Sequence, residues 1–123
     1  MTKLTKMTPV PHGVIFLYDP TMIIDVPPDT SESAVLYTEN CVTVWTIQET
    51  DGDVFLLLSD EEIDVSGQLV FDGTLTTDGR RLAFNDSSVN TIMELDVTSS
   101  RTRISIFTND PQNPTAVACR IHP

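Results

Sequence analysis

The stretch that decides the fold is residues 41–64, CVTVWTIQETDGDVFLLLSDEEID, in which two apolar runs flank a short acidic turn. Residues 41–47 are mostly β-branched and aromatic, and such side chains pack well on a pleated sheet. Asp51-Gly52 follows, and this pair favours a tight turn because glycine adopts positive φ angles at little cost. Residues 54–58, VFLLL, are apolar throughout, which is typical of a strand buried on both faces. These residues predict a β-hairpin whose second strand is central in its sheet or is covered by a second sheet.

Short apolar runs of the same kind recur along the 123 residues, with turn residues between them. We expect further strands at residues 13–18, 21–26, 34–38 and 116–122, and further hairpins at residues 69–84 and 90–108. Eight to ten short strands without an intervening helix predict an all-β fold, an antiparallel β-sandwich, with a barrel as the alternative. Residues 1–9 are expected to be a mobile N-terminal arm, and residues 10–123 a single domain.

Charge is distributed very unevenly along the chain. The net charge is −11, and residues 7–79 hold 14 of the 18 carboxylates but neither Lys nor Arg. Phosphates would be repelled over most of such a surface, so nucleic acid and anionic membranes are not expected as partners. A basic protein is the partner that this charge favours, since an acidic surface attracts cationic proteins and can occupy sites built for phosphates.

The candidate partner-binding residues are carboxylates in three places. One group, in the turn of the first hairpin, is Glu49, Asp51 and Asp53. A second group, directly after the second strand, is Asp60, Glu61, Glu62 and Asp64. A strand of about six to eight residues would hold the two groups about 20 to 25 Å apart. Asp29 and Glu32 lie in a polar segment that is expected to be a flexible loop.

Two further expectations concern the ends and edges of the sheet. If neighbouring strands are antiparallel, the turn at Asp78 lies at the same end as the Glu49 group. In the hairpin at residues 90–108, carboxylates on one strand should form cross-strand pairs with arginines on the next. The residues concerned are Glu94, Asp96, Arg101 and Arg103.

No catalytic motif is present, so an enzyme is not expected. His12 and His122 lie near the two ends of the sequence, and no G-x-S-x-G motif, G-x-G-x-x-G motif or phosphate-binding loop occurs. No cofactor is expected. Cys41 and Cys119 are interpreted as buried free thiols of a cytoplasmic protein, with a disulfide as the alternative. Two cysteines and two histidines make no zinc signature.

A ligand-binding module is the alternative function. Calcium could bind between loops of a sandwich, although EF-hand spacing fails because Val65 and Phe71 stand where Gly and Glu are needed after Asp60. Carbohydrate could stack on Trp45 or Tyr37, although a single Trp in a strand is more often part of the core. Acidity that serves only solubility is a third interpretation.

The order AVLYT, CVTVWTIQ, VFLLLS, QLVFDGTLTTDGRRLAF and RTRISIFT resembles competence protein J, the small acidic all-β inhibitor of the competence DNA-entry nuclease. The resemblance covers roughly residues 34–108, in strand order and hairpin spacing. It implies an intracellular β-sandwich that neutralises a nuclease, and it assigns no individual functional residue. We therefore expect a non-enzymatic inhibitor or immunity protein that binds a basic enzyme, a nuclease in particular.

Overall fold

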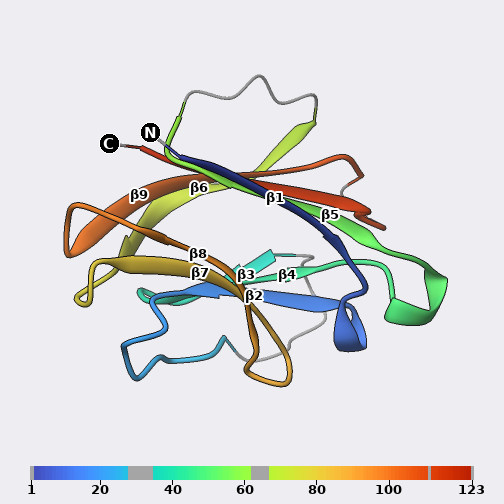
Figure 1. Cartoon of the computed structure of the whole chain (residues 1–123), viewed down its shortest axis with the longest axis horizontal. Coiled ribbons are helices and arrows are strands. Elements are labelled where there is room, and N and C mark those ends of the chain that lie inside the picture. The colour runs from blue at the N-terminus through green and yellow to red at the C-terminus, as the bar shows by residue number, and fades with distance from the viewer. Residues whose placement is uncertain (1, 28–34, 62–66, 111, 123) are drawn as a thin grey trace.

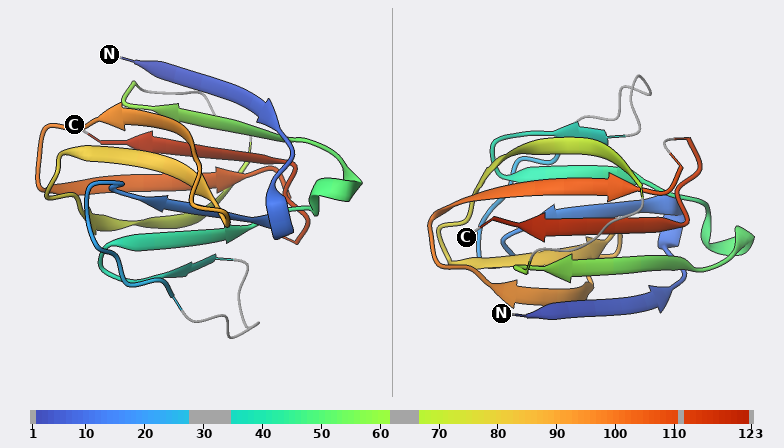
Figure 2. Two further views of the ribbon diagram at one scale, coloured as in Figure 1. Left: turned by 60° about the horizontal axis from the view of Figure 1, so that its bottom comes forward. Right: turned by 90° about the horizontal axis from the view of Figure 1, so that it is seen from above.

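Two β-sheets packed face to face make up the computed structural model, which describes residues 2–27, 35–61, 67–110 and 112–122 (Figures 1 and 2). Sheet 1 has the strand order β1-β5-β10-β9-β6, and sheet 2 has the order β3-β4-β2-β7-β8. The strands of sheet 1 are β1 (Lys3–Thr8), β5 (Val54–Ser59), β6 (Gln68–Thr76), β9 (Arg101–Thr108) and β10 (Ala116–Ile121). Those of sheet 2 are β2 (Val14–Tyr18), β3 (Val35–Tyr37), β4 (Cys41–Trp45), β7 (Arg81–Asp86) and β8 (Thr91–Asp96).

This architecture confirms the predicted all-β sandwich and excludes the barrel, since the two sheets are not closed on each other. Strand β5, the VFLLL run, is central as expected, with β1 on one side and β10 on the other. The β5–β10 pair is parallel, and every other described pair is antiparallel. The helical segments described are two short 3₁₀ turns, η1 (Pro11–Gly13) and η2 (Glu49–Asp51). None of the described segments is a helix of the length and apolarity needed to cross a membrane.

The three predicted hairpins are wrong. Strands β4 and β5 lie in different sheets, and so do β6 and β7, and β8 and β9. Each of these connections crosses from one sheet to the other over an end of the sandwich, as Figure 2 shows. Two strands that stack across a core need the same alternation and the same turn residues as two strands that share hydrogen bonds, so the pattern did not separate these arrangements.

The observed ion pairs also differ from the predicted ones, because the predicted hairpin partners lie in different sheets. Arg81 of β7 contacts Glu94 at 3.4 Å and Asp96 at 3.5 Å on the neighbouring strand β8. Arg103 of β9 contacts Asp72 of β6 at 3.0 Å. The expected pairing of Glu94 and Asp96 with Arg101 and Arg103 therefore does not occur, because β8 and β9 belong to different sheets.

Two expectations about the first 26 residues are also corrected. Residues 3–8, expected to be part of a mobile arm, form the edge strand β1, which is paired with β5 from Lys3↔Ser59 to Thr8↔Val54. Residues 21–26, expected to be a strand, are irregular in the structure. Backbone N–H groups of this segment donate to side-chain oxygens instead of to a neighbouring strand. Thr21 N donates to Asp19 Oδ1 at 2.8 Å, and Asp25 N donates to Asn40 Oδ1 at 2.9 Å.

A single apolar cluster fills the space between the sheets. Its largest fully buried side chains come from both sheets, among them Phe84 and Leu17 of sheet 2 and Leu56, Leu58 and Ile104 of sheet 1. Cys119 belongs to this cluster, and Cys41 is also buried. Both cysteines are free thiols, as predicted. Burial raises the pKa of Cys119 and raises that of Cys41 to about 12.

Asp19 is a fully buried carboxylate that joins the end of β2 to the turn between β6 and β7. Its Oδ1 accepts hydrogen bonds from Thr21 N at 2.8 Å and Thr21 Oγ1 at 2.7 Å, and its Oδ2 accepts one from Gly79 N at 2.7 Å. A Cβ on residue 79 would collide with Thr21 Oγ1, so this close approach requires glycine. The carboxylate thus replaces the regular backbone pairing that was expected after Tyr18.

Replacing Asp19 by Asn should lower the free energy of unfolding by about 1–3 kcal/mol, because an amide NH₂ would face the N–H of Gly79 or Thr21. Asp78→Asn is the matched control, since Asp78 is exposed in the same turn and its side chain accepts no described hydrogen bond. Urea unfolding at neutral pH measures both variants. Equal stability of the two would contradict a structural role for Asp19.

The two buried thiols should make the protein less stable in alkali. Their folded-state pKa values lie above the ordinary value of 9.0, so their contribution is complete below pH 9 and is lost as pH rises towards 12. The difference in unfolding free energy between pH 8 and pH 11 should be smaller in Cys41→Ala/Cys119→Ala than in the parent. The thiol reagent DTNB should react with neither cysteine until the parent is unfolded. Fast labelling of the native protein would refute the burial of both thiols.

Candidate partner-binding surface

The segment between β4 and β5 carries the first predicted acidic group and crosses one end of the sandwich. Its backbone is held at several points, with Ile47 N donating to Pro114 O at 3.1 Å and Asp51 N to Gln48 O at 2.9 Å. Gly52 has a φ of 135°, a value that favours glycine at the end of the turn. The segment is therefore fixed to the β9–β10 connection on sheet 1 as well as to its own strands.

The η1 turn braces the same segment from the side of sheet 2. Thr46 N donates to Gly13 O at 2.7 Å, and Gly13 has a φ of 64°. A Cβ at residue 13 would come within 2.9 Å of Gln48 Nε2, so glycine permits the two segments to pack closely. His12, at the centre of the turn, is exposed, and its Nδ1 lies 2.8 Å from Ser87 Oγ in the β7–β8 turn.

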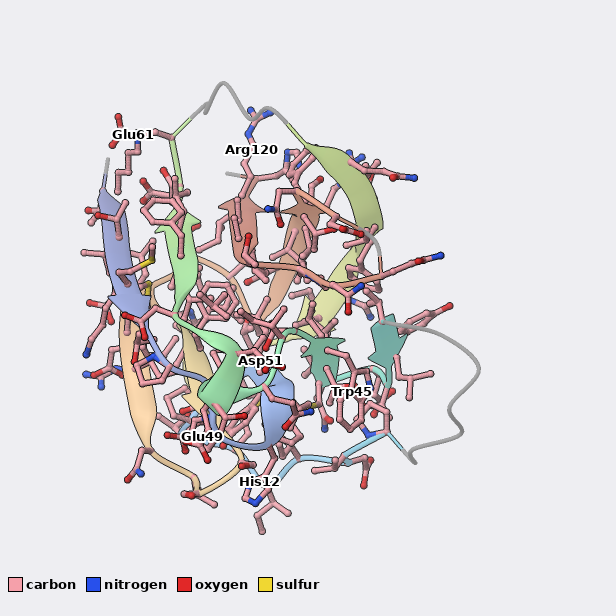
Figure 3. All side chains as sticks on the ribbon, turned by 90° about the vertical axis from the view of Figure 1, so that its right-hand side faces the viewer. His12, Trp45, Glu49, Asp51, Glu61 and Arg120 are labelled. Carbon is pink, nitrogen blue, oxygen red and sulfur yellow. The ribbon has the colours of Figure 1, made fainter. Side chains whose placement is uncertain are left out.

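Figure 3 views this end of the molecule and shows Glu49 and Asp51 facing the reader above His12. Glu49, Asp51 and Asp53 are all exposed. Strand pairing places two further carboxylates at the same end, because β7 ends at Asp86 opposite Ile15 and Asp110 closely follows the end of β9. We refer to these five residues, Glu49, Asp51, Asp53, Asp86 and Asp110, as the acidic end.

The five carboxylates of the acidic end differ in the hydrogen bonds that they accept from the rest of the chain. Asp86 Oδ1 accepts hydrogen bonds from Ser88 N and Asn90 N, and Asp110 Oδ1 accepts from Gln112 N at 2.8 Å. These two carboxylates hold their own turns. In the described part of the chain, Glu49, Asp51 and Asp53 accept no hydrogen bond from any other group and form no ion pair. Their charge thus has no structural use that the described residues reveal.

The second predicted group begins at the far end of β5. Asp60 Oδ1 accepts a hydrogen bond from Thr2 N at 2.6 Å, and Glu61 N donates to Ser59 Oγ at 3.0 Å. Both residues are half-buried, and Lys3 is paired with the preceding Ser59 in the sheet. Asp60 thus has a local partner, unlike the carboxylates of Glu49, Asp51 and Asp53. The other candidates, Glu62, Asp64, Asp29 and Glu32, lie outside the described residues.

The turn at Asp78 does not join the acidic end. Thr77 N donates to Ser100 O at 2.7 Å, which places this turn beside the β8–β9 connection at the opposite end of the sandwich. The expectation failed because it assumed that β5 and β6 run in opposite directions, whereas the registers through β10 and β9 align Gln68 with Leu56, so both strands run away from the acidic end. Asp86 and Asp110 were missed for the same reason, since their position follows from strand pairing that the sequence pattern does not specify.

Two arginines from the last third of the chain, Arg81 and Arg103, form ion pairs away from the acidic end. Arg81 and Arg103 pair with carboxylates on their own sheets, and the hydrogen bond from Arg103 lowers the pKa of Asp72. A cavity of about 390 Å³ at the opposite end brings Arg101 and Arg103 together with Asp60 and Asp96, so charges of both signs meet there. No described arginine or lysine forms an ion pair with Glu49, Asp51 or Asp53.

The residues considered for other chemistry are dispersed. Among the described residues, no group of three or more His, Cys, Asp or Glu side chains could hold a metal ion. His122 Nε2 lies 2.7 Å from Ser105 Oγ, and burial, with help from Arg120 and Arg103, lowers the pKa of this histidine. Ser105 is itself only 6% exposed, which does not suit a nucleophile.

Trp45 and Tyr37 do not form a common platform for a sugar. Tyr37 is paired with Val42, whose side chain is in the core, so Tyr37 lies on the inner face of sheet 2 at its edge. Trp45 is three residues after Val42 and therefore lies on the outer face. Tyr37 contacts Phe71 of sheet 1 instead, with a ring-centroid distance of 5.1 Å.

Comparison with known proteins shows that two solved structures share this fold. No family model matches the chain, and no curated protein matches it in sequence. The structure is similar to the crystal structure of ComJ from Bacillus subtilis, described as an inhibitor of the DNA degrading activity of NucA, with a TM-score of 0.69 and 8% identity over 97% of this chain and 94% of that one. It is also similar to a protein described as crocagin biosynthetic gene J, with a TM-score of 0.59 and 10% identity over 100% and 99%. At these identities the chain shares the fold of a nuclease inhibitor and of a biosynthetic protein.

Proposed function

We propose that this chain is a non-enzymatic inhibitor whose acidic end binds a basic enzyme in the cytoplasm, a nuclease in particular. The observation that carries this proposal is the exposed trio Glu49, Asp51 and Asp53, which the described part of the chain leaves without hydrogen bond or ion pair. Like charges held close together repel, and neutral side chains would suit the same turn. A cationic partner accounts for their presence, because its positive charges would neutralise these carboxylates.

The geometry suits inhibition of an enzyme that acts on nucleic acid. Such an enzyme presents cationic sites spaced for phosphates, and carboxylates fixed on a rigid turn can occupy those sites. The turn is held by backbone hydrogen bonds to Pro114 and Gly13, so little conformational entropy should be lost on binding. The similarity in fold to ComJ, an inhibitor of the DNA degrading activity of NucA, supports a nuclease as the target.

The second acidic group is a further contact region in this proposal. Asp60 and Glu61 stand at the other end of β5, and Glu62, Asp64, Asp29 and Glu32 are kept as candidates from the sequence alone. One compact enzyme need not reach both ends of the sandwich. We assign the primary contact to the acidic end, because Asp60 already accepts a hydrogen bond from the backbone of Thr2.

Neutralising the trio should slow association with the enzyme that co-purifies with this chain. We expect Glu49→Gln/Asp51→Asn/Asp53→Asn to reduce the association rate constant about tenfold or more at low salt, with a smaller change in dissociation. Surface plasmon resonance at 0.05 and 0.5 M salt measures this, and the difference between parent and variant should shrink at high salt. The charge-matched control is Asp78→Asn/Glu94→Gln/Asp96→Asn, at and near the opposite end. Equal loss in both triple variants would assign the effect to net charge alone.

The same trio should be dispensable for folding. Since these side chains accept no described hydrogen bond, their neutralisation should leave the unfolding free energy unchanged or raise it by a few tenths of a kcal/mol. Urea unfolding of the trio variant tests this, beside a DNA-cleavage assay of the co-purified enzyme. A variant that is less stable than the parent and inhibits equally well would mean that the carboxylates serve the fold. A co-purified partner with a net negative charge would contradict the proposal itself.

A further inference from the structure

A groove opens along one side of the sandwich, where the edge strand of sheet 1, β6, faces the edge strand of sheet 2, β3. Its volume is about 600 Å³, and it is lined by Tyr37, Thr38 and Glu39 on one side and by Val70 to Thr74 on the other. Tyr37 is 66% exposed although its ring contacts Phe71, so the two aromatic rings form a partly open floor. The groove lies away from the acidic end and plays no part in the contact proposed above.

The backbone of β6 has unused hydrogen-bonding groups along this groove. In an antiparallel pair, successive residues direct their N–H and C=O groups alternately towards the partner strand and away from it. Thr77 N donates towards the β9 side, to Ser100 O, whereas Thr76 N donates the other way, to Glu39 O at 2.8 Å. The N–H groups of Thr74 and Asp72 therefore also point away from β9, into the groove. Among the described residues neither of them has an acceptor.

The other edges of the two sheets are protected in ways that β6 is not. Strand β1 carries Lys3 and Lys6, β3 is three residues long, and β8 carries Glu94 and Asp96. Lysines, short length and charge are the usual devices that prevent further strands from adding to an edge. Strand β6 has nine residues and a single charge, and after the bulge between Leu69 and Phe71 its pairing with β9 is regular.

We propose that this groove binds an extended segment of the partner protein, which adds as a strand to β6. Backbone bonds to Asp72 and Thr74 would fix the segment, while its side chains would point alternately to the Tyr37–Phe71 floor and to the outer face beside Asp72. Apolar or aromatic residues fit the floor, and Lys or Arg fits the outer face. Glu39, which forms no described ion pair, lines the groove and favours a cation nearby.

Charge also argues against a second copy of this chain in the groove. Two β6 strands paired antiparallel would bring Asp72 of one chain close to the same residue of the other, and each chain has a net charge of −11. A basic segment, by contrast, would be attracted by the negative charge of this chain. The basic character of the segment rests on the proposed function, whereas strand addition rests on the open edge of β6 alone.

The probe for this site is a capped synthetic peptide, Lys-Val-Lys-Tyr-Lys-Val-Lys, titrated into ¹⁵N-labelled protein. We expect saturable shifts of the Asp72, Thr74 and Tyr37 amides, and slower hydrogen exchange at Asp72 and Thr74. Two N-methylated forms of the peptide, blocked on alternate residues, separate strand addition from charge attraction. One form should bind about tenfold or more weakly and the other nearly as well as the parent peptide, because only one set of N–H groups faces β6.

Variants of the protein complete the test. Tyr37→Ala removes an exposed ring from the floor and Thr74→Pro removes one open N–H group, and each should weaken peptide binding at least about fivefold. The trio variant Glu49→Gln/Asp51→Asn/Asp53→Asn should bind the peptide like the parent protein, and if it does not, the acidic end is the peptide's site. Equal binding of both methylated peptides would overturn strand addition. Shifts of the same amides that grow with protein concentration, without peptide, would assign the groove to a second copy and overturn the proposal. If the peptide does not bind the groove but the trio variant loses enzyme binding, strand addition is wrong and the proposed function stands.

Discussion

The apolar faces of the two sheets can be buried only against each other, and this constraint determines where each connection runs. Phe84 and Leu17 from sheet 2 meet Leu56 and Ile104 from sheet 1 across the core. The chain supplies both sheets in alternation, so it crosses between them after β1, β4, β6 and β8. Each crossing passes over an end of the sandwich, where polar and charged side chains reach solvent without disturbing the core. The ends therefore carry charged residues that are exposed to solvent.

The crossing after β4 has the largest consequence for function. Its backbone is bonded to Gly13 on one side and Pro114 on the other, so Glu49, Asp51 and Asp53 stand on a support tied to both sheets. Arg81 and Arg103 are paired with carboxylates of neighbouring strands and leave the field of the trio uncancelled. A fixed, unpaired anionic surface attracts a cationic one over a distance and loses little entropy on contact. Attraction of this kind depends on charge and on a rigid support, and it needs no reactive side chain.

Strand β5 is central, but its VFLLL run is not buried on both faces as expected, since Phe55 is 37% exposed. Local sequence properties predicted most of the strands and the central position of β5, but they missed β1 and predicted a strand at residues 21–26 that does not form. They could not predict which strands are neighbours. A strand pair joined by Asp-Gly reads alike whether its members share hydrogen bonds about 5 Å apart or stack about 10 Å apart across a core. The trio was found because exposed carboxylates in a turn are visible in sequence. Asp86, Asp110 and the open edge of β6 depend on strand order, and Asp19 depends on a contact 60 residues away in sequence.

Hydrogen exchange of the complex with the co-purified basic enzyme tests the central claim most directly. If the acidic end is the contact surface, backbone amides in residues 46–53, 87–90 and 109–115 should exchange more slowly in the complex than in the free chain. Amides in the turns at residues 77–80 and 97–100, at the opposite end, should be unchanged. Protection confined to that opposite end, with none at residues 46–53, would contradict the account.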